Sequence, residues 1–212
     1  DLAGGIAVNA LGHCHPALNA ALKAQADRMW HISNYMVNEP AMRLAQKLVN
    51  ATFADRVFLC NSGTEANEGA LKTARKYAST KYGEQKHRII STTNSFHGRT
   101  WLAVSTGGSP KYTKGMGPVP EGITHIPYND VDALRAVMDD NVACVILEPV
   151  AGNMNLIRPS AAFVQALGEG QAPVQAAHTR GGTDHHMAAR EIRPRQGGRR
   201  IAKVEARHRR AA

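Results

Sequence analysis

The sequence predicts an α/β fold in which helices cover a mostly parallel sheet. Short apolar runs alternate with segments that have the three- to four-residue apolar spacing of a helix face. Strands that alternate with helices usually pair in parallel, with the helices as crossover connections. The clearest strand is 142–147, where Val-Ala-Cys-Val-Ile-Leu forms the continuous apolar run of a strand buried on both faces.

Two helices are expected in the first sixty residues. The first begins at Pro16 and extends through Trp30, and the second extends from Pro40 to about Ala51. Their apolar faces indicate ordinary core packing, and we expect 33–39 between them to be a loop. The residues expected to point inward are Leu18, Ala21, Leu22, Ala26, Met42, Leu44, Ala45, Leu48 and Val49.

Strands and helices then alternate along the chain. A strand at 57–60 leads into a helix from Thr64 to about Tyr82, on which alanines recur every four residues. The later elements expected are strands at 88–92, 123–127 and 142–147, a helix at 101–105, and a helix at 130–140 capped by Asp130. Residues 107–122 form a loop rich in Gly, Pro and Lys.

The turn at 61–65 is the strongest candidate for an anion site. Asn61 or Ser62 is the expected N-cap of the following helix, and Glu65 lies in its first turn. The free N–H groups at a helix N-terminus suit a phosphate, Gly63 permits close approach, and the hydroxyls of Ser62 and Thr64 add donors. Many helices begin Ser-Gly-Thr and bind nothing, so the spacing alone leaves both interpretations open.

A second polar turn, 94–100, follows the strand at 88–92, and Glu148 follows the strand at 142–147. Ligands of parallel sheets bind beyond the carboxyl ends of the strands, which strengthens the phosphate interpretation. The residues of this turn leave alternatives. Phe96 is a core residue or a plate for a flat ring, and His97 is a scaffold residue or an acid–base. Arg99 holds a carboxylate in a bidentate way or is simply solvated.

Composition places few further limits on function. Residues 168–212 carry 10 Lys and Arg against 4 Asp and Glu, so most of the net charge of +9 belongs to this tail. Cys60 and Cys144 lie in apolar runs and are expected to be buried free thiols, which fits a cytoplasmic protein. His13, Cys14 and His15 are adjacent with no fourth ligand in view, so no metal site is expected. No apolar run is long enough to span a membrane.

Three motifs in order carry a family resemblance. They are Asp1-Leu2-Ala3-Gly4-Gly5-Ile6-Ala7-Val8-Asn9 with Gly12-His13-Cys14-His15-Pro16, then Asn61-Ser62-Gly63-Thr64-Glu65-Ala66-Asn67-Glu68, and then Ser95-Phe96-His97-Gly98-Arg99-Thr100. Over about residues 1–167 the chain resembles the class III pyridoxal-phosphate aminotransferases, and it looks most like the acetylornithine/succinylornithine branch. The opening lacks an initiator Met, so we expect the chain to begin within something larger.

The resemblance implies an incomplete large domain of fold type I and a homodimer with sites at the subunit interface. It implies pyridoxal 5'-phosphate as cofactor, held by Ser62, Gly63, Thr64, Phe96 and His97, with the phosphate on Gly63 and Thr64 and the ring on Phe96. Arg99 is implied to hold a substrate carboxylate. The implied reaction is amino-group transfer between N-acetylornithine and 2-oxoglutarate, small-molecule partners of arginine metabolism.

Two departures from the family pattern qualify this. Ornithine-type members usually carry Gln and Glu where this chain has Ala151 and Asn153, and the local string resembles glutamate-1-semialdehyde aminomutase. The family also continues with a strand ending in Asp-Glu-Val-Gln and a later Schiff-base lysine. Residues 168–212 contain neither, and Lys203, the one lysine after Glu148, lacks the family's surrounding pattern.

We therefore expect 1–167 to be a partial aminotransferase domain and 168–212 to be a basic tail poor in aromatics, disordered or out of frame. Without the lysine and the Asp that pairs with the pyridine nitrogen, no catalytic residue is assigned and negligible activity is expected. Two rivals remain: a non-catalytic fragment that only associates, and a nucleic-acid binder acting through the tail. The tail offers no aromatic for base stacking, which disfavours the second.

Overall fold

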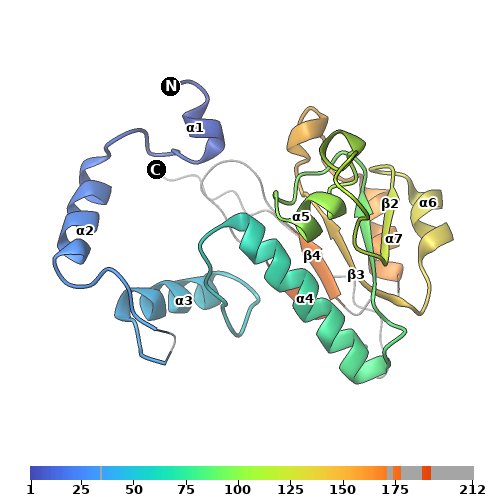
Figure 1. The fold of residues 1–212 in the computed structure, drawn as a ribbon, viewed down its shortest axis with the longest axis horizontal. Coiled ribbons are helices and arrows are strands. Elements are labelled where there is room, and N and C mark those ends of the chain that lie inside the picture. The colour runs from blue at the N-terminus through green and yellow to red at the C-terminus, as the bar shows by residue number, and fades with distance from the viewer. Residues whose placement is uncertain (34, 171–173, 178–187, 192–212) are drawn as a thin grey trace.

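The computed structural model describes residues 1–33, 35–170, 174–177 and 188–191. Its centre is a five-stranded sheet with the order β2-β1-β3-β4-β5 (Figure 1). The strands are β1 Arg88–Thr92, β2 Ile123–Ile126, β3 Val142–Leu147, β4 Val174–Ala177 and β5 Ala188–Glu191. The β2–β1, β1–β3 and β3–β4 pairs are parallel, and the β4–β5 pair is antiparallel. The predicted parallel α/β sheet is therefore confirmed.

Strand β3 is the core of the sheet. All six of its residues are buried, as the continuous apolar run predicted, because helices cover both faces. Cys144 and Ile146 point to one face, while Val145 and Leu147 point to the other. Side chains that alternate in this way give the sheet two separate apolar layers.

Four helices make the two covering layers. Helices α4 (Gly63–Tyr82) and α5 (Trp101–Thr106) lie on the face of Ile89 and Cys144. Helices α6 (Val131–Val137) and α7 (Ala161–Glu169) cover the opposite face, where Phe163 is fully buried. The helices expected at 64–82, 101–105 and 130–140 are thus confirmed, although α6 ends three residues early. Asp130 caps α6 as predicted, since its side chain accepts from Ala133 N at 2.8 Å.

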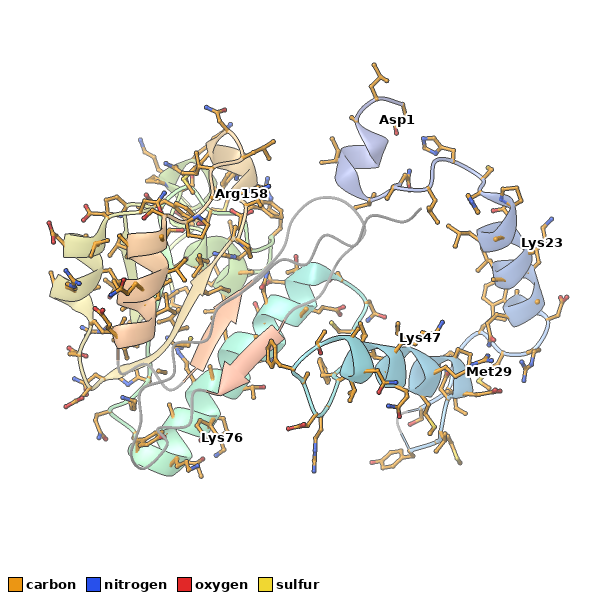
Figure 2. The ribbon with its side chains drawn as sticks, turned by 180° about the vertical axis from the view of Figure 1, so that it is seen from behind. Asp1, Lys23, Met29, Lys47, Lys76 and Arg158 are labelled. Carbon is orange, nitrogen blue, oxygen red and sulfur yellow. The ribbon has the colours of Figure 1, made fainter. Side chains whose placement is uncertain are left out.

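The N-terminal segment differs from the prediction. Helices α1 (Gly4–Ala7), α2 (Pro16–Ala26) and α3 (Glu39–Ala51) lie to one side of the sheet and its covering helices (Figures 1 and 2). Helices α2 and α3 form near the expected positions but contain no buried residue, so the expected core packing is wrong. Leu22, for example, is 70 % exposed. No residue of α2 or α3 belongs to either apolar core cluster of the described chain.

The expected strand at 57–60 is also absent. These residues are outside any strand, and Phe58 is 76 % exposed. A strand needs a neighbour to satisfy its backbone groups, and no described strand pairs with this run. The thiol of Cys60 is consequently exposed and not buried, whereas Cys144 on β3 is buried as expected. Burial raises the pKa of the Cys144 thiol to about 12.

The tail contains two strands that the sequence did not predict. Strand β4 pairs with β3 through the register Cys144↔Val174 to Leu147↔Ala177, and β5 pairs with β4. The physical reason is that β3 pairs with β1 on one side only, and the N–H and C=O groups on its other side are buried and require hydrogen-bond partners. The other residues of 171–212, including Lys203, lie outside the described part of the chain.

No helix within the described ranges is both long and apolar enough to cross a membrane.

The contrast between the two ends of the molecule can be measured by matched substitutions. Leu71 on α4 is fully buried, so Leu71→Ala should lower the free energy of unfolding by about 2–5 kcal/mol. Leu22→Ala on α2 makes the same chemical change at an exposed site and should change it by less than about 0.5 kcal/mol. Urea denaturation followed by circular dichroism measures both. Equal losses would show that α2 packs in a core after all.

Candidate functional site

The N-terminal turn of α4 is fixed by its own side chains. Ser62 is the N-cap, and its hydroxyl accepts from Glu65 N at 3.2 Å. The Glu65 carboxylate in turn accepts from Asn61 N at 2.7 Å. Hydrogen bonds from the Asn61 side chain and then its backbone N–H lower the pKa of Glu65, so the carboxylate stays charged at neutral pH. Of the two N-caps the sequence allowed, Ser62 is the correct one.

This turn leaves donors directed beyond the helix. The first N–H groups of a helix have no acceptor within it, and Ser62 satisfies only that of Glu65. The N–H groups of Gly63 and Thr64 therefore remain at the N-terminus of a 20-residue helix. The aligned peptide dipoles add positive potential at the same place. The arrangement suits an anion, as the sequence predicted.

The second turn, 94–100, is attached to α4 by two hydrogen bonds. Asn67, which is fully buried, donates through Nδ2 to His97 O at 2.7 Å. Thr100 donates through Oγ1 to Glu68 Oε1 at 2.6 Å. All four residues belong to the two motifs of the sequence, which itself assigns no role to Asn67 or Glu68. The structure shows that Asn67 and Glu68 connect the two turns.

Gly98 brings the two turns into direct contact. Its φ of +126° is rarely adopted by L side chains, and a Cβ placed there would overlap Thr64 Oγ1 and lie 2.7 Å from Thr64 Cγ2. Only the absence of a side chain at Gly98 lets the backbone of the second turn rest against Thr64. Thr64 and the turn that carries Phe96 are therefore in direct contact.

The sheet holds the second turn from the other side. Phe96 N donates to Glu148 Oε2 at 3.1 Å, and the Glu148 side chain is fully buried at the carboxyl end of β3. His97 is buried as well, with Nε2 at 3.3 Å from Ser91 Oγ on β1. Phe96 and His97 are thus anchored to the two central strands through a carboxylate and a hydroxyl.

Tyr128 holds the backbone of Glu148 by a hydrogen bond. Its hydroxyl donates to Glu148 O at 2.6 Å, and its ring stacks on Phe163 with centroids 6.1 Å apart. Burial, followed by the nearby charge of Glu148, raises the pKa of Tyr128 to about 12. The phenol therefore remains a protonated donor across the physiological range. No pattern in the sequence pointed to this residue.

Arg99 projects from the same turn and is exposed. Its guanidinium carbon lies 5.4 Å from the centroid of the Phe96 ring and 4.1 Å from that of Tyr112. Tyr112 belongs to the short 3₁₀ helix η1 (Pro110–Tyr112), in a stretch from which the sequence predicted only a loop. The contact of Gly98 with Thr64 places the start of α4, with Ser62, Gly63 and Thr64, against the turn that carries Phe96, His97 and Arg99. These are the residues that the resemblance implied.

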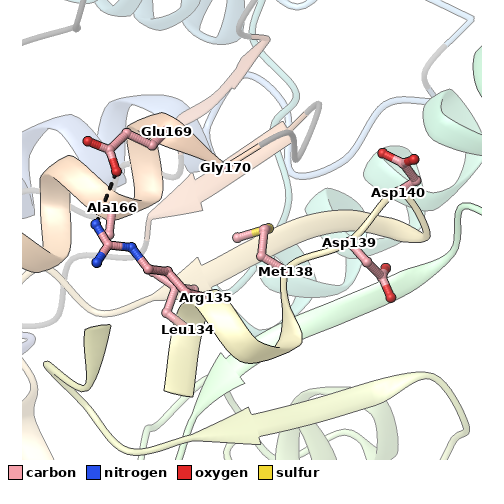
Figure 3. A pocket seen from close by; sticks show the side chains of 8 residues that line it. All are labelled: Leu134, Arg135, Met138, Asp139, Asp140, Ala166, Glu169 and Gly170. Atoms are coloured by element: carbon pink, nitrogen blue, oxygen red, sulfur yellow. Dashed lines mark hydrogen bonds and ion pairs between the residues drawn. The ribbon is translucent and has the colours of Figure 1, made fainter. Parts of the chain in front are cut away.

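A pocket seen elsewhere in the molecule is not part of this surface. It lies between α6 and α7, where Arg135 and Glu169 form an exposed ion pair at 3.3 Å (Figure 3). Asp139 and Asp140, which also line it, precede β3, so the pocket is at the opposite end of the strand from Glu148. Among the described residues, no three His, Cys, Asp or Glu side chains are grouped so as to hold a metal ion.

Comparison with known proteins assigns the family. The family model described as Aminotransferase class-III matches residues 1–170. The chain belongs to the class-III aminotransferases. The acetylornithine aminotransferase of Pseudomonas putida is 57 % identical over 165 residues, and the succinylornithine transaminase of Salmonella typhimurium is 56 % identical over 169. These alignments cover 78 % and 80 % of this chain but 41 % of each relative.

Solved structures of the family share the fold. The N-acetylornithine aminotransferase of Stenotrophomonas maltophilia is 40 % identical, with a TM-score of 0.64 over 80 % of this chain and 41 % of that one. The ornithine aminotransferase of Toxoplasma gondii is 32 % identical, with a TM-score of 0.72 over 79 % and 40 %. The resemblance to the acetylornithine/succinylornithine branch is confirmed. The chain of this class-III aminotransferase spans about two fifths of the length of these relatives.

The contact between the two turns predicts that an alanine substitution lowers stability more at Gly98 than at a glycine outside the contact. Gly98→Ala places a methyl group against Thr64, whereas at Gly115, with φ +81°, a new methyl group would meet no atom within 4 Å. Both changes impose backbone strain, but only the first adds overpacking. We expect Gly98→Ala to cost about 1–3 kcal/mol more unfolding free energy than Gly115→Ala, measured by urea denaturation. Equal costs would mean that the turns do not touch.

Proposed function

We propose that this chain carries the cofactor-binding part of a pyridoxal-phosphate aminotransferase of the acetylornithine type. The reaction is amino-group transfer between N-acetylornithine and 2-oxoglutarate, a step of arginine metabolism. Relatives with acetylornithine and succinylornithine in their names, 54–58 % identical over 165 to 169 residues, support the substrate class. The observation that carries the proposal is the contact of Gly98 with Thr64, which joins an anion-binding turn to an aromatic one.

The residues present fit pyridoxal 5'-phosphate. The phosphate would be held by the N–H groups of Gly63 and Thr64 with the hydroxyls of Ser62 and Thr64, which are donors suited to an anion. The pyridine ring would stack on Phe96, whose backbone is fixed by Glu148 at 3.1 Å. His97 would keep the stacking turn in place through its contact with Ser91. When bound, the cofactor supplies an electron sink for the amino-acid carbon.

Arg99 would hold a carboxylate of the substrate. Its guanidinium is exposed beside the Phe96 ring, so a carboxylate bound there would place the rest of the substrate over the stacked cofactor. Two parallel N–H···O bonds fix the orientation of a carboxylate as well as its position. Both the amino acid and the 2-oxo acid of the proposed reaction carry such a group.

The alternative substrate, glutamate-1-semialdehyde, rests on Ala151 and Asn153. Ala151 is buried and bridged to Ile157, while Asn153 is exposed on the 3₁₀ helix η2 (Gly152–Met154). Ala151 therefore serves the packing of its own segment, and the relatives named above favour the acetylornithine type.

Association and localisation complete the proposal. We propose a cytoplasmic homodimer, with exposed apolar residues of α2 and α3 available for association, and no nucleic-acid partner. We further propose that 1–167 forms the aminotransferase domain and that 168–212 is a tail outside the family pattern, although its strands β4 and β5 pair with the sheet.

Cofactor binding can be tested by equilibrium dialysis of pyridoxal 5'-phosphate against the purified chain. Thr64→Val removes a hydroxyl donor to the phosphate and should weaken binding about tenfold or more, the usual cost of a hydrogen bond to a charged group. Phe96→Ala should weaken it by removing the stacking face. Thr80→Val, the same change near the other end of α4, should leave binding unchanged. Identical binding by the Thr64→Val and Thr80→Val variants would contradict the proposed phosphate site.

Turnover by the 212-residue chain is expected to be negligible. Lys203 is the only lysine after Glu148, and it lacks the family's surrounding pattern, so no residue is assigned to bind the cofactor covalently. Glutamate formation from N-acetylornithine and 2-oxoglutarate, with cofactor added, should not exceed that of the buffer. Activity that disappears on Lys203→Ala would prove this expectation wrong.

A further inference from the structure

Arg99 is held by aromatic rings and not by a carboxylate. Its guanidinium carbon lies 4.1 Å from the Tyr112 centroid and 5.4 Å from the Phe96 centroid, both within cation–π range. Within the described ranges, no Asp or Glu oxygen lies at ion-pair distance from Arg99. A ring contacts the face of a guanidinium, whereas its N–H donors lie along the edge. The contact with Tyr112 therefore leaves the donors of Arg99 available.

The backbone fixes both partners of this contact. Arg99 follows Gly98, whose position is set by Thr64, and precedes α5. Tyr112 ends η1, where its N–H donates to Ser109 O at 3.0 Å. Trp101 on α5 donates through Nε1 to Pro118 O at 3.1 Å, which ties the loop that carries Tyr112 back to the helix that follows Arg99. The ring is thus supported independently of the arginine that rests on it.

We propose that Tyr112 is a positioning residue for substrate recognition, since it holds the Arg99 guanidinium with its donor edge open to a carboxylate. The proposal rests on the proposed role of Arg99 and extends it to a residue on a different loop. A long arginine side chain that is free in solution must lose rotamer freedom when it binds. Contact with Tyr112 restricts that freedom beforehand, so its effect should appear in carboxylate affinity. Contact with the ring, and not the phenol hydroxyl, provides this restriction.

The test compares ring loss with hydroxyl loss in the full 212-residue chain. Tyr112→Leu removes the ring, whereas Tyr112→Phe keeps it. Titration with 2-oxoglutarate, followed by two-dimensional ¹H–¹⁵N NMR of arginine Nε–Hε groups, reports both affinity and the environment of Arg99, whose signal is assigned by its loss in Arg99→Lys. We expect Tyr112→Leu to weaken binding about two- to fivefold and to shift the Arg99 signal, and Tyr112→Phe to do neither.

Tyr82→Leu is the matched control, because Tyr82 also lies near a cation, with Lys86 Nζ 5.6 Å from its centroid. It ends the 20-residue helix α4, about 30 Å along the axis from the turn at Gly63, so 2-oxoglutarate binding should not change. Thermal unfolding of each variant identifies any loss of the fold. If Tyr112→Leu is unfolded, the role of the ring is decided by Tyr112→Phe, which should keep both the 2-oxoglutarate affinity and the Arg99 signal of the unaltered chain.

The outcomes separate the two proposals. If Arg99→Lys weakens binding but Tyr112→Leu does not, Tyr112 has no positioning role while Arg99 keeps its proposed one. If neither variant weakens binding, or the unaltered chain does not bind 2-oxoglutarate, both assignments are overturned. An equal effect of Tyr112→Leu and Tyr112→Phe would assign the effect to the hydroxyl and refute a role for the ring.

Discussion

The candidate site depends on the contact between Gly98 and Thr64, where a missing side chain lets two backbone turns meet. A Cβ at Gly98 would lie 2.8 Å from Thr64 Cβ, so no other residue fits without displacing a turn. The contact holds the N-terminus of α4 against the turn that carries Phe96. Asn67 and Glu68 reinforce it through hydrogen bonds to His97 O and Thr100. A flat anion bound at the proposed site would contact both turns at once.

The central strands anchor that contact to the core. Glu148 continues β3 and binds Phe96 N, while Ser91 on β1 approaches His97. Both strands are buried between two helical layers, so the turns are attached to the buried core of the described chain. Burial of the Glu148 carboxylate is costly unless it accepts hydrogen bonds, and the backbone of the second turn supplies one. The site and the core therefore support each other.

The N-terminal helices are exposed on faces that have the composition of a core. The apolar residues of α2 and α3 have the spacing of core helices, yet no residue on either helix is buried. Exposed apolar faces of this extent are typical of surfaces that pack against other chain segments or other subunits. The chain spans about two fifths of its relatives, which is consistent with surfaces that the described residues do not cover.

The sequence by itself determined the parallel strands β1, β2 and β3, the helices α4, α5 and α6, the cap Asp130, and the residues of the two turns. These follow from local patterns: apolar periodicity, capping side chains and motif order. The sequence left the cap of α4 open between Asn61 and Ser62, and it did not predict α7. Tertiary structure alone decided that 57–60 is not a strand, that α2 and α3 are exposed, that β4 and β5 complete the sheet, and that Tyr112 rests on Arg99. Each of these depends on whether a partner distant in sequence is present. Local sequence indicates which secondary structure a residue prefers, but it does not indicate which other segment of the chain the residue will pack against.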